Sequence, residues 1–204
     1  MNRATGPILF SLLALILSGC GKTKPIRYYA IQSSTAPTLS SGTPTVSLLV
    51  ADISTPAIFR DSPIAYRIGT NEVGTYQYSR WVEPPVELVH GNLIHILRSS
   101  GNYQSVDSLG SASGGQYVIR GHLYDFEEVD SASGITGLVS MDFQLYDRKS
   151  GKVVWSHVYS QSEPVQGKEI SAIVTALDVN LERGLKEVAA GLDQYFAANP
   201  AGKS

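Results

Sequence analysis

The sequence predicts a single α+β domain, with a mixed or largely antiparallel sheet and two main helices packed on it. Short strand-like stretches with period-two alternation recur between residues 27 and 160. Two longer segments, 85–99 and 170–196, instead carry apolar residues at helical spacing. The formal net charge of −2 argues against a nucleic-acid partner and against a polybasic membrane surface.

The first residues, 1–19, form a processing signal and not part of the fold. Arg3 supplies a positive charge, and the apolar run 8–17 is too short to span a bilayer. Cys20 is the only cysteine of the chain and ends the sequence Leu17-Ser18-Gly19-Cys20, which resembles the lipobox of bacterial lipoproteins. We therefore expect a covalent lipid on Cys20, while an ordinary secretory signal with a chance cysteine is the alternative.

Removal of the first 19 of the 204 residues leaves 185, which is enough for one domain with its own core. Residues 20–26 are the lipidated cysteine and a short tether, 27–198 the domain, and 199–204 a disordered tail. The five residues after Cys20 span at most roughly 18 Å, so the domain should lie close to its membrane. With one cysteine the chain has no internal disulfide.

The domain begins with a predicted strand at 27–32, followed by a polar loop at 33–45 that is rich in Ser, Thr, Pro and Gly. The nearly continuous apolar run at 46–51 predicts a strand that is covered on both faces and is central in its sheet.

Residues 60–85 predict a β-hairpin, because two alternating stretches flank a loop with Asn71 and two glycines. One interpretation is an aromatic-rich hairpin that packs on the sheet, with Ile64 and Tyr66 turned inward. The other is a recognition surface, since Tyr, Trp and Arg are enriched at interface hot spots. The candidate contact residues are Arg60, Asp61, Tyr66, Arg67, Asn71, Glu72, Tyr76, Tyr78, Arg80 and Trp81. If Arg67 and Arg80 serve contact only, their replacement by Ala should leave the melting temperature nearly unchanged.

A helix is predicted at 85–99, with the proline pair at its start and Gly101 as its stop. His90 lies beside its apolar stripe and is interpreted as a hydrogen-bonded boundary residue. A short strand at 103–106 and a Gly/Ser-rich loop follow. Three further strands at 117–129, 138–147 and 153–160 form an antiparallel meander, and the middle one alternates cleanly between apolar and polar residues.

An acidic cluster ends the first strand of this meander. It can supply oxygen ligands to a calcium ion, but a solvated loop is the preferred interpretation. Its members are Asp125, Glu127, Glu128 and Asp130.

The last element is a long helix at 170–196 with apolar spacing throughout. Residues 178–180 and Gly184 are weak points, so a kink or two shorter helices stay open.

No catalytic, nucleotide-binding or metal motif is present: the sequence has no GxSxG, P-loop, HExxH or CxxC pattern. We expect no enzyme activity, no metal and no cofactor other than the lipid on Cys20. An unrecognised hydrolase built around one of the four histidines is the remaining catalytic alternative.

Several stretches of the hairpin together resemble one family. They are Tyr66-Arg67-x-Gly69, Asn71-Glu72-Val73 and residues 76–81, followed by Glu83-Pro84-Pro85. This order is similar to that of the ABC-type transport auxiliary lipoproteins, including the paraquat-inducible lipoprotein component, which accompany transporters of the mammalian-cell-entry (MCE) type. The resemblance implies a non-catalytic lipoprotein that contacts a periplasmic MCE-domain protein and its ABC permease and ATPase, and assists lipid traffic across the envelope.

The resemblance also bears on the location. In enteric bacteria an aspartate after the lipidated cysteine retains a lipoprotein at the inner membrane, and this chain has Gly21 there. We therefore expect the periplasmic face of the outer membrane rather than the inner. A homo-oligomer stays open, and an envelope-assembly lipoprotein that activates a cell-wall or outer-membrane machine is the alternative function.

Overall fold

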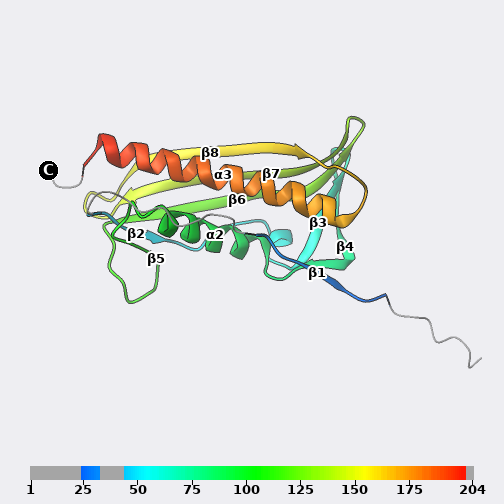
Figure 1. The fold of residues 1–204 in the computed structure, drawn as a ribbon, viewed down its shortest axis with the longest axis horizontal. Helices are drawn as coiled ribbons and strands as arrows, with labels where there is room; N and C mark the ends of the chain where they lie inside the picture. Colours follow the sequence, from blue (N-terminus) through cyan, green and yellow to red (C-terminus); the bar gives the residue numbers. More distant parts are fainter. Residues whose placement is uncertain (1–23, 33–43, 201–204) are drawn as a thin grey trace, which may run out of the picture.

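The computed structural model describes residues 24–32 and 44–200. The processing signal, Cys20 and most of the polar loop at 33–45 lie outside the described residues. Within them one sheet of eight strands is covered on one face by two helices, as Figure 1 shows. The predicted α+β class with two main helices is confirmed.

The elements follow each other along the chain as two short strands, a hairpin, a helix, a four-strand segment and a long final helix. They are β1 Arg27–Tyr29, β2 Ser47–Val50, the 3₁₀ helix η2 Ala57–Phe59, β3 Pro63–Ile68, β4 Glu72–Trp81, α2 Pro85–Ser99, β5 Ser105–Ser108, β6 Tyr117–Ser131, β7 Gly134–Asp147, β8 Lys152–Pro164 and α3 Ile170–Ala198.

The long strand β6 organises the sheet. On one side it pairs antiparallel with β7, which in turn pairs antiparallel with β8, so the predicted meander is confirmed. Its other side is shared by two strands, both parallel to it: β2 pairs near its start and β3 near its end. The sheet therefore forks, with β5 beside β2 on one branch, and β4 and then β1 beside β3 on the other.

The core lies between β6, β7 and β8 and the two helices. Val139, Met141, Phe143 and Leu145 of β7 are all fully buried, as the alternation of that strand predicts. In β2, Leu48 and Val50 belong to this core while Leu49 packs in a smaller cluster with Val118. Because both faces of β2 are covered, the prediction of a central strand is also confirmed.

Helix α3 runs unbroken for 29 residues, so neither of its weak points breaks it. Gly184 sits where the helix approaches the sheet most closely: a Cβ there would lie 2.6 Å from Met141 Cε and 2.7 Å from the Tyr159 ring. Asn180 is fully buried. Glycine and asparagine both have low helix propensity. At Gly184 and Asn180 this cost is offset by contacts with the sheet. Among the described residues, no helix is long and apolar enough to cross a membrane.

Candidate functional site

The hairpin β3–β4 stands at one end of the molecule, on the far half of β6 (Figure 1). Its register pairs Ile68 with Glu72 and places Gly69 at the turn with φ of 60°. The Gly69 amide donates to the Asp130 carbonyl oxygen at 2.9 Å, which ties the turn to the end of β6. The predicted hairpin is confirmed, and β6 holds it along one edge.

On the face of the hairpin that carries Ile64, two tyrosines enclose a carboxylate. Tyr66 lies across Gly74, where a Cβ would be only 2.5 Å from the tyrosine hydroxyl oxygen. Its ring packs against Tyr76 at 5.1 Å between centroids. The Tyr76 hydroxyl donates to Glu128 Oε2 at 2.5 Å, and Glu128 is only 5% exposed. Burial raises the pKa of the Glu128 carboxyl, partly opposed by this hydrogen bond, and raises the pKa of Tyr76 as well.

Successive residues of a strand point to opposite faces, so Arg67 lies on the other side of the hairpin from Tyr66. There Arg67 pairs with a second buried carboxylate. Arg67 Nε donates to Glu127 Oε1 at 2.6 Å, and the guanidinium reaches Asp125 Oδ1 at 3.3 Å. The Glu127 side chain is fully buried, and its Oε2 has no hydrogen-bond partner among the described residues. Burial raises the pKa of Glu127 although Arg67 opposes the shift. Arg67 therefore serves the fold in this structure.

Trp81 ends β4 inside the core, with no exposed surface. Its ring meets Phe126 edge-on at 5.4 Å, and its amide donates to the Ser62 carbonyl oxygen at 2.7 Å. This burial removes Trp81 from the candidate contact surface and corrects that assignment. Ile64 is also fully buried, as expected, while Tyr78 and Arg80 are half-buried on the same strand.

The remaining candidates are exposed but do not form one patch. Arg60 and Asp61 precede β3, whereas Asn71 and Glu72 lie at its far end. The six residues of β3 separate the two pairs by roughly 20 Å. Arg60 lines a cavity of about 270 Å³ between residues 52–55 and the first half of α2.

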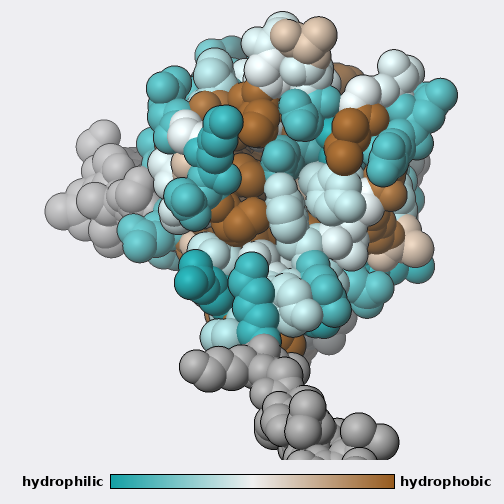
Figure 2. Space-filling view, turned by 90° about the vertical axis from the view of Figure 1, so that its right-hand side faces the viewer, coloured by the Kyte–Doolittle hydropathy of each residue, from teal (hydrophilic) through white to brown (hydrophobic). Residues whose placement is uncertain are grey.

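The hairpin tip, which we define as residues 68–73, combines polar and apolar exposed side chains. Besides Asn71 and Glu72 it exposes Ile68 at 46% and Val73 at 44%. Figure 2 views this end of the molecule, where hydrophobic residues reach the surface in patches separated by hydrophilic ones. The tip therefore offers mixed contact chemistry on a support that the turn bond to Asp130 holds in place.

The acidic cluster is where the sequence interpretation failed. Glu127 and Glu128 are neither loop residues nor solvated, because β6 continues through them to Ser131. The described residues contain no group of His, Cys, Asp and Glu side chains that could hold a metal ion. The sequence did contain a signal of this burial. Glu127 and Glu128 stand between Phe126 and Val129, within an otherwise strand-like stretch.

The histidines are placed by ordinary contacts. His122 lies 2.7 Å from the Ser54 hydroxyl oxygen through Nδ1, and its ring packs on Tyr124. His157 stacks on Trp155 and approaches Glu187 at 3.7 Å. His90 is partly buried, but its Nε2 has no partner among the described residues, so the expected hydrogen bond from that atom is not found. Asp142 lies opposite His122 on β7, but its carboxylate accepts a hydrogen bond from the Tyr124 hydroxyl at 2.6 Å. Among the described residues no hydrogen bond joins Asp142 to His122, so the linked serine, histidine and carboxylate of a triad are not found there.

Comparison with known proteins agrees with this architecture. A Xanthomonas campestris protein of the DUF330 family has a structure that matches with a TM-score of 0.75 and 17% identity, over 84% of this chain and 98% of that one. An uncharacterised protein matches with a TM-score of 0.66 and 13% identity, over 83% and 99% of the two chains. At such identities these likenesses show the fold alone. No curated protein matches the sequence significantly.

The family model of the ABC-type transport auxiliary lipoprotein component matches residues 29–189. The match runs from the end of β1 into the last third of α3, and so includes the hairpin, both buried glutamates and the whole meander. The chain belongs to the ABC-type transport auxiliary lipoprotein component family.

Proposed function

We propose that this auxiliary lipoprotein is a non-catalytic subunit of an MCE-type ABC transport system and contacts the periplasmic MCE-domain protein through its hairpin tip. Acyl chains on Cys20 hold the domain at a membrane, while the permease spans the inner membrane and carries the ATPase on its cytoplasmic side. In this arrangement the domain assists the passage of lipid or another hydrophobic compound across the envelope. Family membership and the resemblance of the hairpin residues to MCE-associated lipoproteins support the proposal.

The observation that carries the proposed contact is the exposure of the hairpin tip. Ile68 and Val73 expose nearly half of their surface although both belong to strands. Branched apolar side chains with adjacent polar groups, presented on a fixed turn, are suited to a protein partner. Tyr66, Arg67 and Tyr76 act differently: their contacts with β6 hold the hairpin, and so they position the tip.

The outer membrane is the proposed location, because Gly21 replaces the aspartate that retains lipoproteins at the inner membrane in enteric bacteria. Separation of inner and outer membranes on a density gradient tests this assignment. A Gly21→Asp variant should move toward the inner-membrane fraction if the chain follows that sorting rule. Self-association stays a separate proposal, which light scattering of the purified lipoprotein tests.

The decisive experiment is an affinity pull-down of the intact lipoprotein from detergent-solubilised envelopes, with mass spectrometry of the proteins that copurify. Recovery of an MCE-domain protein supports the transport role. The variant Asn71→Ala with Val73→Asp should lower that recovery about tenfold, the effect of losing roughly 1.4 kcal/mol of binding free energy.

Val158→Asp is the matched control, because Val158 is 72% exposed on β8, outside the hairpin. This variant should copurify the MCE-domain protein as the wild type does. Equal losses in both variants would contradict the hairpin tip as the contact. Recovery of cell-wall synthases or assembly factors without an MCE-domain protein would contradict the transport role and favour the envelope-assembly alternative.

A further inference from the structure

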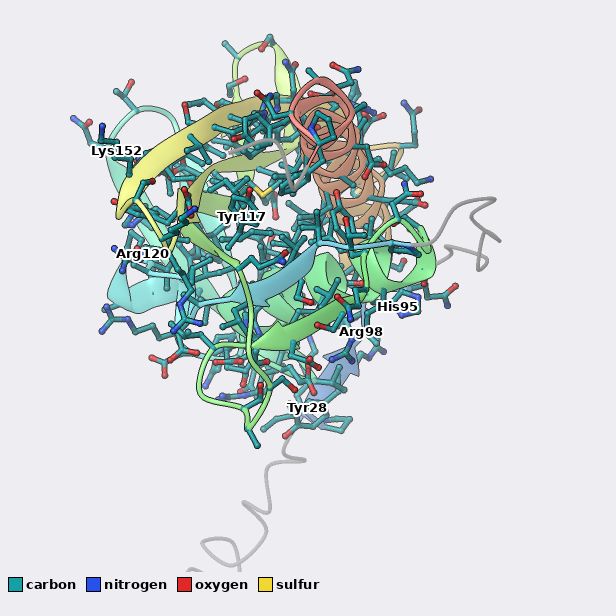
Figure 3. The ribbon with its side chains drawn as sticks, turned by 90° about the vertical axis from the view of Figure 1, so that its left-hand side faces the viewer. Tyr28, His95, Arg98, Tyr117, Arg120 and Lys152 are labelled. Carbon is teal, nitrogen blue, oxygen red and sulfur yellow. The ribbon has the colours of Figure 1, made fainter. Side chains whose placement is uncertain are left out.

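A second surface lies where the described chain begins. Residues 24–29 run beside β4 and past the start of α3, and enclose with them a cavity of about 750 Å³. Its lining includes two basic side chains and three tyrosines: Lys24, Arg27, Tyr28, Tyr29 and Tyr78. Figure 3 shows Tyr28 at one extreme of the molecule, far from Lys152.

The charges of this cavity favour an anion. Lys24 Nζ lies 5.5 Å from the centroid of the Tyr78 ring, and both Lys24 and Arg27 are exposed. Neither cation forms an ion pair among the described residues. Of the described residues that line the cavity, Glu169 at the N-cap of α3 is the one that is acidic. A local pair of basic residues stands out in a chain whose net charge is −2.

Exposed apolar or aromatic side chains lie on the same segment as the basic pair and on the residue after β4. Ile26, Tyr28 and Val82 are exposed at 46%, 62% and 55%. Val82 follows β4 next to this segment, because its amide donates to the carbonyl oxygen of Tyr29 at 2.9 Å. Basic residues beside exposed tyrosine and branched apolar residues suit the boundary between lipid headgroups and acyl chains.

The lipid anchor places a membrane within reach of this surface. Lys24 follows Cys20 by four positions, which limits the distance between them to roughly 14 Å. This step rests on the acylation of Cys20 in the proposed function.

We propose that the anchor-side face, which we define as Lys24, Ile26, Arg27, Tyr28, Tyr78 and Val82, docks on the anionic phospholipid surface in which Cys20 is anchored. A lipid phosphate lies in the cavity beside Lys24 and Arg27, and Tyr28 and Ile26 enter the headgroup layer. The ten residues of β4 lead from the hairpin tip to Trp81 beside β1, a distance of roughly 33 Å. Docking at the anchor-side face therefore keeps the hairpin tip off the membrane and open to a periplasmic partner.

The single cysteine gives a direct test. The mature chain from Cys20 onward contains every described element, and coupling Cys20 to a maleimide lipid attaches it to vesicles at the natural anchor position. A tryptophan reporter at Tyr28→Trp is compared with one at Tyr124→Trp, which is 45% exposed on β6. Brominated lipids in phosphatidylcholine vesicles, with and without phosphatidylglycerol, quench a tryptophan that reaches the headgroup layer.

We expect stronger quenching at position 28 than at position 124, and more of it when phosphatidylglycerol is present. The double variant Lys24→Ala with Arg27→Ala should abolish the difference in quenching between positions 28 and 124. The control Lys149→Ala with Lys152→Ala should leave that difference intact. Equal quenching at the two positions, or quenching at position 28 that ignores both phosphatidylglycerol and the basic pair, would overturn the proposal.

A partition measurement gives a second readout. The mature chain with Cys20→Ser should bind phosphatidylglycerol vesicles, and loss of Lys24 and Arg27 should weaken the partition by about tenfold or more. Partition that is unchanged in that variant, with circular dichroism showing a folded chain, would overturn the proposal. Acylation is tested apart from this, by the intact mass of the lipoprotein, so a failed anchor and a failed docking face give different results.

Discussion

The half of the sheet under the helices and the half that carries the hairpin are held together by different interactions. Under α2 and α3 the strands contribute side chains such as Phe143 and Leu145, which are fully buried and apolar. At the hairpin the buried groups also include two carboxylates, Glu127 and Glu128, each paired with a hairpin side chain. Apolar packing tolerates exchanges of similar volume, whereas a buried ion pair demands a specific partner.

This contrast explains why unusual residues accumulate in the hairpin. Arg67 and Tyr76 are each matched to one carboxylate of β6, so the polar pairs fix the register of β3 and β4 on that strand. The exposed hairpin tip then has a defined position without a helix to cover it. The predictions below test this division of roles, beginning with the residue at which the two halves meet.

Trp81→Ala should have the largest effect, because Trp81 brings the hairpin into the helix-covered core. Removal of this fully buried ring should lower the free energy of unfolding by about 3–5 kcal/mol in denaturant titrations. Trp81→Phe, which keeps an aromatic ring near Phe126, is the matched control and should lose less. A stability close to that of the wild type in Trp81→Ala would return this residue to the contact surface.

Arg67→Ala should lower the free energy of unfolding by about 1.5–3 kcal/mol, because it leaves the Glu127 carboxylate buried without its charged donor. The Arg67 side chain is 29% exposed, so water reaching the vacated space limits the loss. The double variant Arg67→Met with Glu127→Leu should be more stable than Arg67→Ala, since no charge then remains buried. An unchanged melting temperature in Arg67→Ala would restore the contact role expected from sequence.

Asn180→Ala tests a buried polar link inside the helix-covered half. Asn180 Nδ2 donates to the carbonyl oxygens of Gly137 and Gln161 at 2.9 and 2.7 Å, and Oδ1 accepts from the Tyr159 hydroxyl at 2.5 Å. Each group left unpaired costs about 1–3 kcal/mol, so thermal unfolding should show a clear loss. Asn71→Ala, at the exposed hairpin tip, should change stability far less. A loss in Asn180→Ala no larger than that in Asn71→Ala would mean that water replaces the Asn180 amide fully.

The smallest effect concerns pH. Burial raises the pKa of Glu128 above its ordinary value of 4.5, so the folded state favours the protonated carboxyl. The contribution of this group to stability is therefore full below pH 4.5 and falls as pH rises through the folded pKa. The Glu128→Gln side chain cannot ionise. The stability of this variant relative to the wild type should therefore increase as pH rises from 4.5 through the folded pKa of Glu128. A difference between the two proteins that does not change with pH would show that Glu128 ionises normally.

Much of the fold could be predicted from local sequence patterns. The alternation of β7 and the spacing of α2 determine which faces are buried, because periods of two and 3.6 translate directly into faces. The α2 bounds, 85–99, were predicted as observed, since Pro85 starts the helix and Gly101 follows its end. The family resemblance of the hairpin was likewise visible in its residues and is confirmed by the match over 29–189.

The tertiary structure decided which candidates are available to a partner. Glu127 and Arg67 are 60 residues apart in the chain, and only the parallel pairing of β3 with β6 brings them together. The same pairing buries the glutamates that looked solvated, while Trp81 turns into the core at the end of β4. Local pattern reports the face on which a side chain lies, but long-range strand pairing determines what covers that face. For that reason the sequence by itself specified the hairpin, and the fold alone separated its supporting residues from its exposed tip.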